Sequence, residues 1–304
     1  MRNTFADTFY QAGRTDPRLC VVVADISPAG SIQKFRQDFP ERFINTGVAE
    51  QIMIALCAGM AQRGLRPFAY TIATFALFRP FEMIRDDLCY QNLPVTVVGI
   101  GGGVTYSTLG ATHHAQEDIA IACALPNMSV IAPCDPAETR AATQWCAVHE
   151  HGPVYLRLAK AGEPDLTANA AEPWQFGRIR HLRRGTDVAV LSYGPILGLA
   201  AQVADHLEAR GQSATLVSVH TLKPLDRAGL ADALARHARV VVIEEASPQG
   251  GLGVRVKEIA WETRATCRID AFSLDDAFHH VHGSHADLLA AHGLSRDHIL
   301  EALP

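Results

Sequence analysis

Short runs of apolar residues, rich in valine and isoleucine, alternate along the chain with longer stretches of helical periodicity. In the first half, strands are predicted over residues 19–24, 95–100, 128–132 and 154–158, and helices over residues 52–62, 78–91 and 136–149. In the second half, strands are predicted over residues 187–192, 213–219 and 239–243, and helices over residues 197–210 and 227–237. Strands that alternate with helices indicate parallel sheets covered on both faces. The predicted fold class is therefore α/β, with two doubly wound domains.

A turn-rich segment interrupts this alternation. Residues 161–173 are weakly apolar and contain the glycine and prolines typical of a connection between domains. A chain of 304 residues is long enough for two domains of ordinary size. We therefore expect a first domain at residues 1–165, a linker at 166–185 and a second domain at 186–304.

Composition narrows the class of protein. The chain is 48% hydrophobic and 19% charged, and it contains neither a signal peptide nor an apolar run long enough to cross a membrane. Its seven cysteines form no Cys-x-x-Cys pair, which favours a reducing cytoplasm. A net charge of −5 without a basic run argues against nucleic-acid binding. The expected partners are small molecules or another protein chain.

Histidines are numerous, and they raise the question of a metal site. The densest group is His279 to His282 together with His285. It lacks cysteine or carboxylate partners at the spacing of zinc ligands. A solvated loop is therefore the preferred interpretation, and no metal ligand is predicted in this chain.

One carboxylate stands out, because Glu50 is the only charged residue between Arg42 and Arg63. Burying an ionised carboxylate without a partner costs several kcal/mol. Glu50 is therefore expected to raise its pKa, to find a hydrogen-bond partner or to meet a ligand. The alternative is an ordinary residue at the start of a helix that reaches solvent or a backbone amide.

Two further groups of residues follow Glu50 along the chain. Phe75, Phe78 and Phe81 recur every three residues, a spacing that places their rings on one side of a helix. His113 and His114 follow a glycine-rich loop, and imidazole is the side chain best suited to proton transfer near neutral pH. Taken singly, the rings could form a core stripe, and each histidine could be structural.

Taken in order, five segments resemble the C-terminal half of transketolase-type, thiamine-diphosphate-dependent enzymes. They are Gly47-Val-Ala-Glu-Gln51, Thr74-Phe-Ala-Leu-Phe78, Gly110-Ala-Thr-His-His114, Leu222-Lys-Pro-Leu-Asp226 and Glu244-Glu-Ala-Ser-Pro-Gln-Gly-Gly-Leu-Gly253. The resemblance covers nearly the whole chain. It implies a pyrimidine-binding (thiamin-diphosphate-binding) fold followed by a transketolase C-terminal domain. The last segment is interpreted as a structural turn whose glycines allow close approach of the backbone.

The resemblance also implies roles for the residues already singled out. Glu50 matches the glutamate that binds N1′ of the cofactor's aminopyrimidine and thereby favours formation of the C2 ylide. Aromatic residues around the pyrimidine match Phe75, Phe78 and Phe81, of which Phe78 is the better candidate for stacking. Ile26 matches the bulky residue that holds the cofactor bent. His113 matches the histidine that contacts substrate and shuttles protons. His114 stands where glutamine is common and is counted with His113 as a candidate catalytic residue.

An absence in the sequence bears on the partner. Enzymes of this type bind the diphosphate through Mg²⁺ on a domain that begins with Gly-Asp-Gly, and this chain contains no Gly-Asp-Gly. The resemblance therefore implies a β-type subunit of a split transketolase. The Mg²⁺ ligands would lie on a separate N-terminal-type subunit, and the simplest symmetric assembly would be an α2β2 heterotetramer.

Substrate positions depart from the sugar-phosphate pattern of the family. Leu109 stands where an acidic residue is common, and Gly101 where a substrate histidine is expected. Lys160 replaces a phosphate-binding arginine, and Arg157 could compensate for that change if its side chain pointed the same way. A two-carbon ketol transfer between sugars is the preferred activity. Alternatives are the β-subunit of a 2-oxoacid dehydrogenase E1 component, a 1-deoxyxylulose-phosphate synthase-like enzyme and a non-catalytic scaffold.

Overall fold

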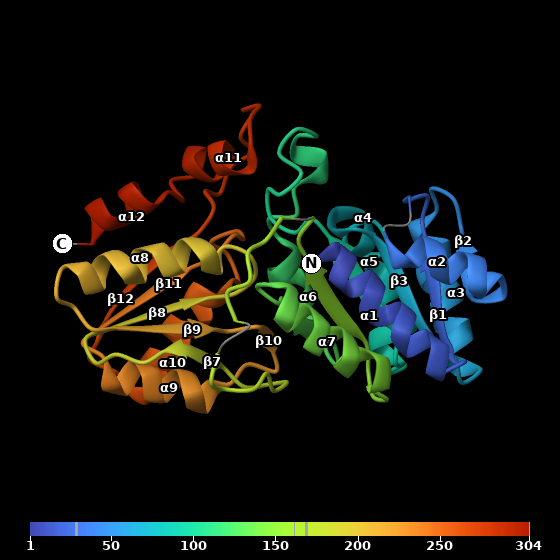
Figure 1. Cartoon of the computed structure of the whole chain (residues 1–304), viewed down its shortest axis with the longest axis horizontal. Coiled ribbons are helices and arrows are strands. Elements are labelled where there is room, and N and C mark those ends of the chain that lie inside the picture. Colours follow the sequence, from blue (N-terminus) through green and yellow to red (C-terminus); the bar gives the residue numbers. More distant parts are fainter. Residues whose placement is uncertain (28–29, 161, 168–169, 304) are drawn as a thin grey trace.

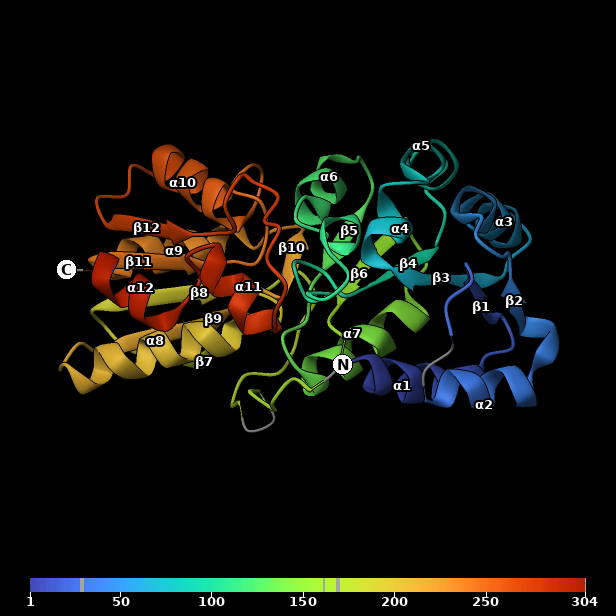
Figure 2. The same ribbon diagram turned by 90° about the horizontal axis from the view of Figure 1, so that it is seen from above.

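The chain forms two β-sheets, each covered by helices on both faces (Figures 1 and 2). The computed structural model describes residues 1–27, 30–160, 162–167 and 170–303. The first sheet is built mainly by the first half of the chain and the second sheet by the second half. The two doubly wound α/β domains expected from the sequence are confirmed.

The first sheet has seven strands, and all neighbouring pairs are parallel except the pair at one edge. Across the sheet the order is β10 (Thr221–Lys223), β5 (Ser129–Ile131), β6 (Val154–Leu158), β4 (Thr96–Ile100), β3 (Arg66–Ile72), β1 (Leu19–Val23) and β2 (Phe43–Asn45). The antiparallel strand β10 comes from the second half of the chain and pairs with β5. The two domains therefore share a sheet.

Side chains of the first sheet alternate between two buried clusters, as a strand requires. Val21 and Val23 pack on one face with Phe5 and Phe9. That face is covered by α1 (Arg2–Thr15), α2 (Ser31–Asp38) and α7 (Pro136–Val148) (Figure 2). The opposite face is covered by α3 (Glu50–Gln62), α4 (Ala73–Leu77), α5 (Phe81–Met83), the π-helical turn η2 (Ile84–Tyr90) and α6 (Asp118–Ala124). Short 3₁₀ turns occur at η1 (Pro40–Arg42) and η3 (Ala111–His113).

The second sheet has five strands in the order β12 (Arg268–Phe272), β11 (Arg239–Ile243), β8 (Val188–Ser192), β9 (Ala214–Ser218) and β7 (Arg180–Arg183). Strand β7 is antiparallel to β9, and the other pairs are parallel. One face is covered by α8 (Leu197–Ala209), α11 (His285–Ala291) and α12 (Arg296–Ala302), and the other by α9 (Arg227–Arg236) and α10 (Leu252–Thr263) (Figure 1). No described helix is both long and apolar enough to span a membrane.

Two sequence predictions about the elements need correction. A single helix over residues 78–91 is wrong, because α4 ends at Leu77 and helical structure resumes only at Phe81. Pro80 has no N–H and disfavours a helical conformation in the residue before it. Strand β7 lies inside the predicted linker at 166–185, so part of that segment belongs to the second sheet. Residues 168 and 169 of the linker lie outside the described residues.

The Leu222-Lys-Pro-Leu-Asp226 segment ties the two domains together. Lys223, in β10, donates from Nζ to the carbonyl of Cys123 at 2.9 Å and also to that of Leu125, where α6 ends. A cation suits the negative end of a helix. Asp226 caps α9 through the N–H of Gly229 and also accepts the N–H of Ile179. The motif is therefore structural in this chain.

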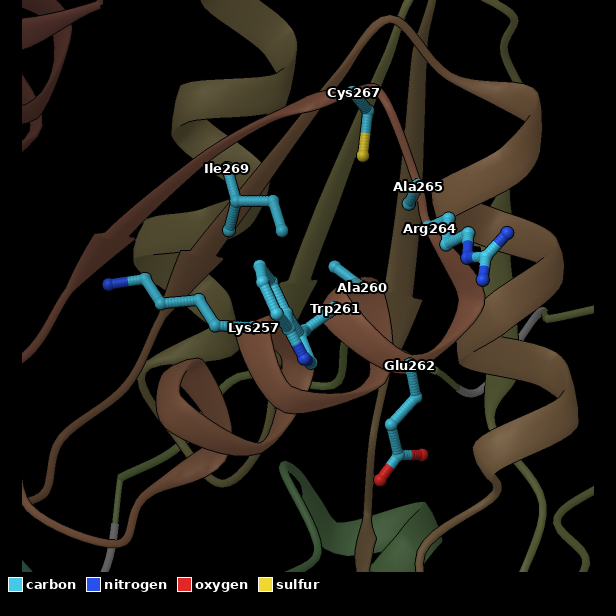
Figure 3. Close-up of a pocket in the computed structure, with 8 residues that line it drawn as sticks. All are labelled: Lys257, Ala260, Trp261, Glu262, Arg264, Ala265, Cys267 and Ile269. Atoms are coloured by element: carbon cyan, nitrogen blue, oxygen red, sulfur yellow. The ribbon is translucent and has the colours of Figure 1, made fainter.

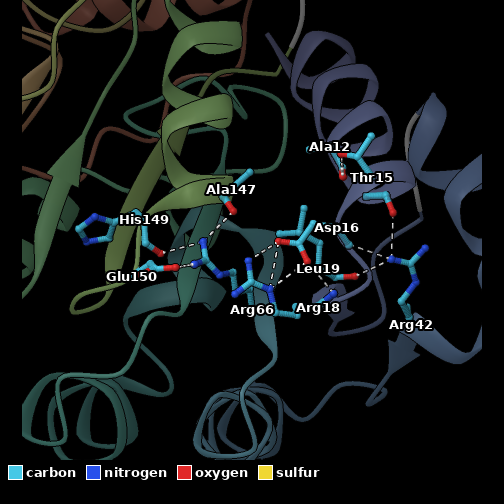
Figure 4. Close-up of polar contacts among 11 residues, drawn as sticks. Ala12, Thr15, Asp16, Arg18, Leu19, Arg42, Arg66, Ala147, His149 and Glu150 are labelled. Atoms are coloured by element: carbon cyan, nitrogen blue, oxygen red, sulfur yellow. Dashed lines mark hydrogen bonds and ion pairs between the residues drawn. The ribbon is translucent and has the colours of Figure 1, made fainter.

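Charged groups at the amino edge of the first sheet are matched inside the chain (Figure 4). Arg42 donates to the carbonyl of Gly13 at 2.9 Å and lies 3.9 Å over the ring of Phe39. Arg66 donates to the carbonyl of Ala147 at 3.0 Å and pairs with Glu150. The charged side chains at this edge are therefore already paired within the chain. The carboxyl edge, described below, differs in this respect.

Candidate active site

Most of the predicted site residues lie just beyond the carboxyl ends of neighbouring strands of the first sheet. Ile26 follows β1, Glu50 follows β2, Phe75 follows β3, Gly101 follows β4 and Lys160 follows β6. In open α/β sheets, ligands bind in the crevice at this edge. The topology therefore brings to one edge residues that are far apart in the sequence.

Glu50 is the first residue of α3 and is only 2% exposed. Its Oε2 accepts a hydrogen bond from Nη1 of Arg79 at 2.9 Å. The N-terminus of α3 also favours a negative charge at this position. Within the described part of the chain, Arg79 is the one side chain that pairs with Glu50, and the Arg79 side chain is itself 42% exposed. Of the expected outcomes, the hydrogen-bond partner is realised.

Aromatic and cationic side chains continue in a row from this ion pair. The guanidinium of Arg79 lies 5.0 Å over the ring of Phe75, and Phe75 meets His113 edge to face at 5.2 Å between ring centroids. His113 also meets Tyr106 at 6.2 Å, and Nζ of Lys160 lies 5.3 Å over the Tyr106 ring. The row brings together the predicted residues Glu50, Phe75, His113 and Lys160. Sequence reasoning missed Arg79 and Tyr106.

The other predicted aromatic residues face a separate cavity of about 510 Å³. Phe78, Phe81 and His114 line it together with Thr74, Ala111, Thr112, Glu117, Ile121 and Phe278. The Oγ1 of Thr74 and the Nε2 of His114 are buried and have no hydrogen-bond partner among the described residues. The cavity therefore has aromatic walls, and two of its lining residues carry a buried polar atom that has no partner among the described residues. The three predicted phenylalanines do not share one surface, since Phe75 turns toward Arg79 and His113.

Burial lowers the pKa of both site histidines. His113 lies beside Thr112, with 3.0 Å between Nδ1 and Oγ1, and burial holds its pKa below the ordinary value. For His114, burial lowers the pKa and an interaction with the backbone of Tyr106 partly opposes this. Both rings are therefore neutral near pH 7 and can accept a proton or a hydrogen bond.

Arg157 is a correction to the predicted substrate contacts. Its side chain is buried, Nε donates to Oδ2 of Asp118 at 2.8 Å, and Nη2 donates to the carbonyl of Glu245 at 2.8 Å. Because these donors are used within the chain, Arg157 cannot take over the role of a phosphate-binding arginine. Lys160, by contrast, is exposed.

Gly101 and Ile26 are explained by their neighbours. Gly101 has a φ of +77°, and a Cβ at this position would lie 2.1 Å from the Tyr106 ring. The ring of Tyr106 therefore takes the space that a side chain at position 101 would need. Ile26 is partly buried against the cluster on the α1 face, and Leu109 is 50% exposed.

Both domains match known families. Residues 1–162 match the transketolase pyrimidine-binding domain, and residues 177–299 match the transketolase C-terminal domain. The chain belongs to the transketolase family. Its resemblance to this family, inferred from five short segments, is thereby confirmed.

Relatives of this transketolase-family chain include proteins named as transketolase subunits. It is 31% identical to a subunit of apulose-4-phosphate transketolase from Phocaeicola vulgatus, over 98% of this chain and 94% of that protein. It is 34% identical to a 6-deoxy-6-sulfo-D-fructose transketolase subunit from Clostridium sp., over 86% and 81%. It also matches 1-deoxy-D-xylulose-5-phosphate synthase from Bacillus cereus with 33% identity, but spans only 47% of that enzyme.

Solved structures agree with this placement. A split-gene transketolase described as an inactive β4 tetramer has a TM-score of 0.90 and 35% identity, with 99% of this chain and 96% of that chain covered. Transketolase from Campylobacter jejuni has a TM-score of 0.83 at 18% identity and shares the fold, with 99% of this chain and 46% of that chain covered.

The histidine-rich loop of the second domain has protein partners in this transketolase-family chain. His279 pairs with Asp275 at 3.0 Å and meets the ring of His292 edge to face at 4.1 Å. These three residues lie close enough together to suggest a metal site. However, Nδ1 of His292 accepts the N–H of Asp275 at 3.1 Å, so Nε2 of the neutral ring carries the proton. A protonated nitrogen has no lone pair for a metal, and this arrangement therefore disfavours one.

The glutamate pair of the Glu244 to Gly253 segment has two structural roles. Oε2 and Oε1 of Glu244 accept the N–H groups of Leu252 at 2.7 Å and Gly253 at 2.8 Å, at the start of α10. The hydroxyl of Tyr193 donates to the same carboxylate at 3.0 Å. A Cβ on Gly251 would lie 2.4 Å from Glu244, so this glycine gives the carboxylate its space. Glu245 instead faces the first domain.

A further cavity, of about 900 Å³, lies between α10 and the residues around β12 (Figure 3). Its lining includes Trp261, which is highly exposed, together with Lys257, Glu262, Arg264 and Cys267. None of the predicted site residues lines this cavity. A large volume alone therefore does not identify this cavity as the candidate active site.

Proposed function

We propose that this chain is one of the two subunits of a split, thiamine-diphosphate-dependent transketolase in the cytoplasm. The reaction would transfer a two-carbon ketol unit from a ketose donor to an aldose acceptor. One observation carries the proposal. In a transketolase-family chain, Glu50 is buried at the carboxyl edge of the first sheet, and its partner among the described residues is the half-exposed Arg79.

The residues at this edge fit the aminopyrimidine of thiamine diphosphate. Glu50 offers a buried carboxyl group that can share a proton with ring nitrogen N1′, and a directional hydrogen bond is strong in such surroundings. Phe75 offers an aromatic surface on the Glu50 side, and Phe78 and Phe81 offer aromatic surfaces in the neighbouring cavity. Thr74 and His114 line the same cavity as Phe78 and Phe81 and bring polar side chains to it. Ile26 would support the bent form of the cofactor, and the bound cofactor supplies a carbon nucleophile at C2 of its thiazolium.

The chain's own residues then have distinct tasks. Glu50 binds and orients the ring, and Arg79 has to share or release the Glu50 carboxylate when this happens. His113 and His114 are neutral near pH 7, because burial lowers the pKa of each ring. They can therefore hold substrate oxygens and accept a proton from a substrate hydroxyl. Phe75 and Tyr106 hold the ring of His113 between them.

The diphosphate and its Mg²⁺ are assigned to a separate subunit. This assignment is supported by the lack of Gly-Asp-Gly in the chain. It is also supported by relatives named as transketolase subunits and by a split-gene relative that is inactive as a β4 tetramer. The simplest active assembly is an α2β2 heterotetramer with the cofactor between unlike subunits.

The proposed donor is an anionic ketose. Lys160 is exposed at the site edge and offers a positive charge beside Tyr106. The two relatives named above act, by their names, on a phosphorylated and on a sulfonated sugar. Because Tyr106 takes the space at Gly101 and Leu109 is apolar, the sugar hydroxyls would be bound differently than in enzymes for common pentose phosphates.

Reconstitution with a Gly-Asp-Gly-containing partner subunit provides the test. The mixture with thiamine diphosphate and Mg²⁺ should transfer a ketol unit between sugar phosphates, and neither subunit alone should do so. Calorimetric titration of the cofactor into this chain alone should give little or no heat of binding. Decarboxylation of 2-oxoacids by the mixture, without ketol transfer, would instead identify a 2-oxoacid dehydrogenase component.

A further inference from the structure

The loop that carries the site histidines is closed at its base and attached to the second domain. We call residues 104–114 the histidine loop. Gly103 and Ala115 pair across the base of this loop, with N···O distances of 3.0 and 2.8 Å. Just beyond it, the N–H of Ser247 donates to the carbonyl of Gln116 at 2.7 Å. The two ends of the loop are thus fixed to each other and to the second domain.

Glu245 makes the main attachment. Its Oε1 accepts the N–H of Val104 at 2.8 Å and the Nε2 of His285 at 2.8 Å. Gly103 makes this approach possible, because a Cβ there would lie 2.2 Å from Oε1 of Glu245. The side chain of Val104 is fully buried in the cluster that also holds Leu197 of α8. Backbone and side chain at the start of the loop are therefore both anchored in the second domain.

We propose that Glu245 and His285 are positioning residues, through which the second domain holds the histidine loop and so sets the places of His113 and His114. His285 is the first residue of α11 and its side chain is 35% exposed, whereas Glu245 is buried. The His285 ring is thus the part of the attachment that solvent can reach. That the held histidines serve ketol transfer rests on the proposed function, but the attachment itself does not.

Charge strengthens this attachment within a limited pH range. Burial would lower the pKa of His285, but Glu245 raises it overall; for Glu245, burial would raise the pKa, but His285 and Arg157 lower it overall. The charged groups that face His285 are Glu245, Glu163, Arg157 and, when protonated, His114. The raised histidine pKa means that the stabilisation is complete below pH 6.5 and is lost as pH rises through the folded value.

Hydrogen exchange of the full chain tests the proposal without any activity assay. His285→Ala should speed exchange of the amides of residues 104–114 by about ten-fold, as loss of a hydrogen bond to a charged group predicts. Exchange in α8 should not change. In the unaltered chain, the same amides should lose protection as pH rises above 6.5, after correction for intrinsic rates.

Two further variants separate positioning from simple stability. His285→Lys should restore slow exchange and remove its pH dependence, because lysine keeps its charge at pH 8.5. His282→Ala, at an exposed histidine three residues earlier, should behave like the unaltered chain. Unchanged exchange in His285→Ala, or failure of His285→Lys to restore it, would overturn the proposal. If the reconstituted pair lacked transketolase activity, the proposed function would fail while this measurement still decided the attachment.

Discussion

Glu50 and Glu244 are equally buried, at 2% exposure each, but the chain treats them differently. Glu244 receives two backbone N–H groups and a tyrosine hydroxyl from its own domain. Burial raises its pKa, and these donors and Arg157 oppose the rise. Among the described residues, Glu50 receives one donor, from a half-exposed arginine. The chain thus satisfies the carboxylate that holds a helix in place with three donors, whereas the partner of Glu50 can be reached from solvent.

The largest effect should follow from neutralising Glu50. In the reconstituted pair, Glu50→Gln should lower kcat by about 10²- to 10⁴-fold, the usual contribution of a positioned acid or base. The fold and assembly should be unaffected, because Glu50 carries little of the chain's own bonding. Steady-state kinetics and size-exclusion chromatography measure the two quantities. Turnover like that of the unaltered pair would refute the role given to Glu50.

Glu244→Gln should lower the stability of the chain and leave the kcat of the reconstituted pair unchanged. The amide cannot accept the N–H groups of both Leu252 and Gly253, and one buried donor is left unpaired. The free energy of unfolding should fall by about 1–3 kcal/mol, the cost of one unsatisfied buried group. Urea unfolding of the chain alone measures this loss. The folded fraction should keep its kcat, and a large loss of kcat at full folding would show that Glu244 is not purely structural.

Acidification should protonate His113 and His114 and thereby lower the activity of the reconstituted pair. Burial lowers the pKa of His113 and His114, so each ring stays neutral down to pH 6.5, its ordinary pKa, and beyond. Protonation costs folding free energy only as pH falls from 6.5 toward the lowered folded values. We expect kcat/KM to fall several-fold as pH falls below 6.5. A pH profile whose acid limb is centred above pH 7 would contradict this assignment.

The smallest effect should come from the arginine that pairs with Glu50. Arg79→Lys keeps a cation beside the buried Glu50 carboxylate and alters an ion pair with one half-exposed partner, a kind that contributes roughly 0–1 kcal/mol. Chemical unfolding of the chain alone should therefore change by less than about 1 kcal/mol. Arg79→Ala, which leaves the buried Glu50 carboxylate without this partner, serves as the contrasting variant and should cost more than Arg79→Lys. A loss in Arg79→Lys as large as that in Glu244→Gln would remove the contrast between the two glutamates.

Sequence reasoning could single out candidate site residues because the main signals are local. Glu50 stands alone in an apolar run, and the phenylalanines and histidines lie in compact motifs. The strand pattern also predicted the parallel sheet whose carboxyl edge holds these motifs. What it could not supply was the direction of each side chain, which separates Phe75 from Phe78 and Phe81.

The missed residues act over long sequence separations. Arg79 meets Glu50 across 29 residues, and Glu245 meets Val104 across 141. Phe75 and Arg79 are four residues apart, a spacing that brings side chains together at a helix end. This spacing was the one local signal that Arg79 lies near the predicted site. Strand β3 was missed because it contains Pro67. The proline is tolerated because the pairing of β3 with β4 begins only at Phe68. The direction of the Arg157 side chain could not be predicted, because it is set by Asp118, which lies 39 residues away in the sequence.

Strand β10 has a consequence for any attempt to divide this protein. The boundary between the domains in the sequence lies before residue 177, but the first sheet is finished by residues 221–223. A fragment truncated at that boundary would expose the backbone edge of β5 and leave the end of α6 without Lys223. Exposed strand edges template intermolecular pairing. Such a fragment should aggregate rather than behave as an independent folding unit, so the second half of the chain also protects the first from self-association.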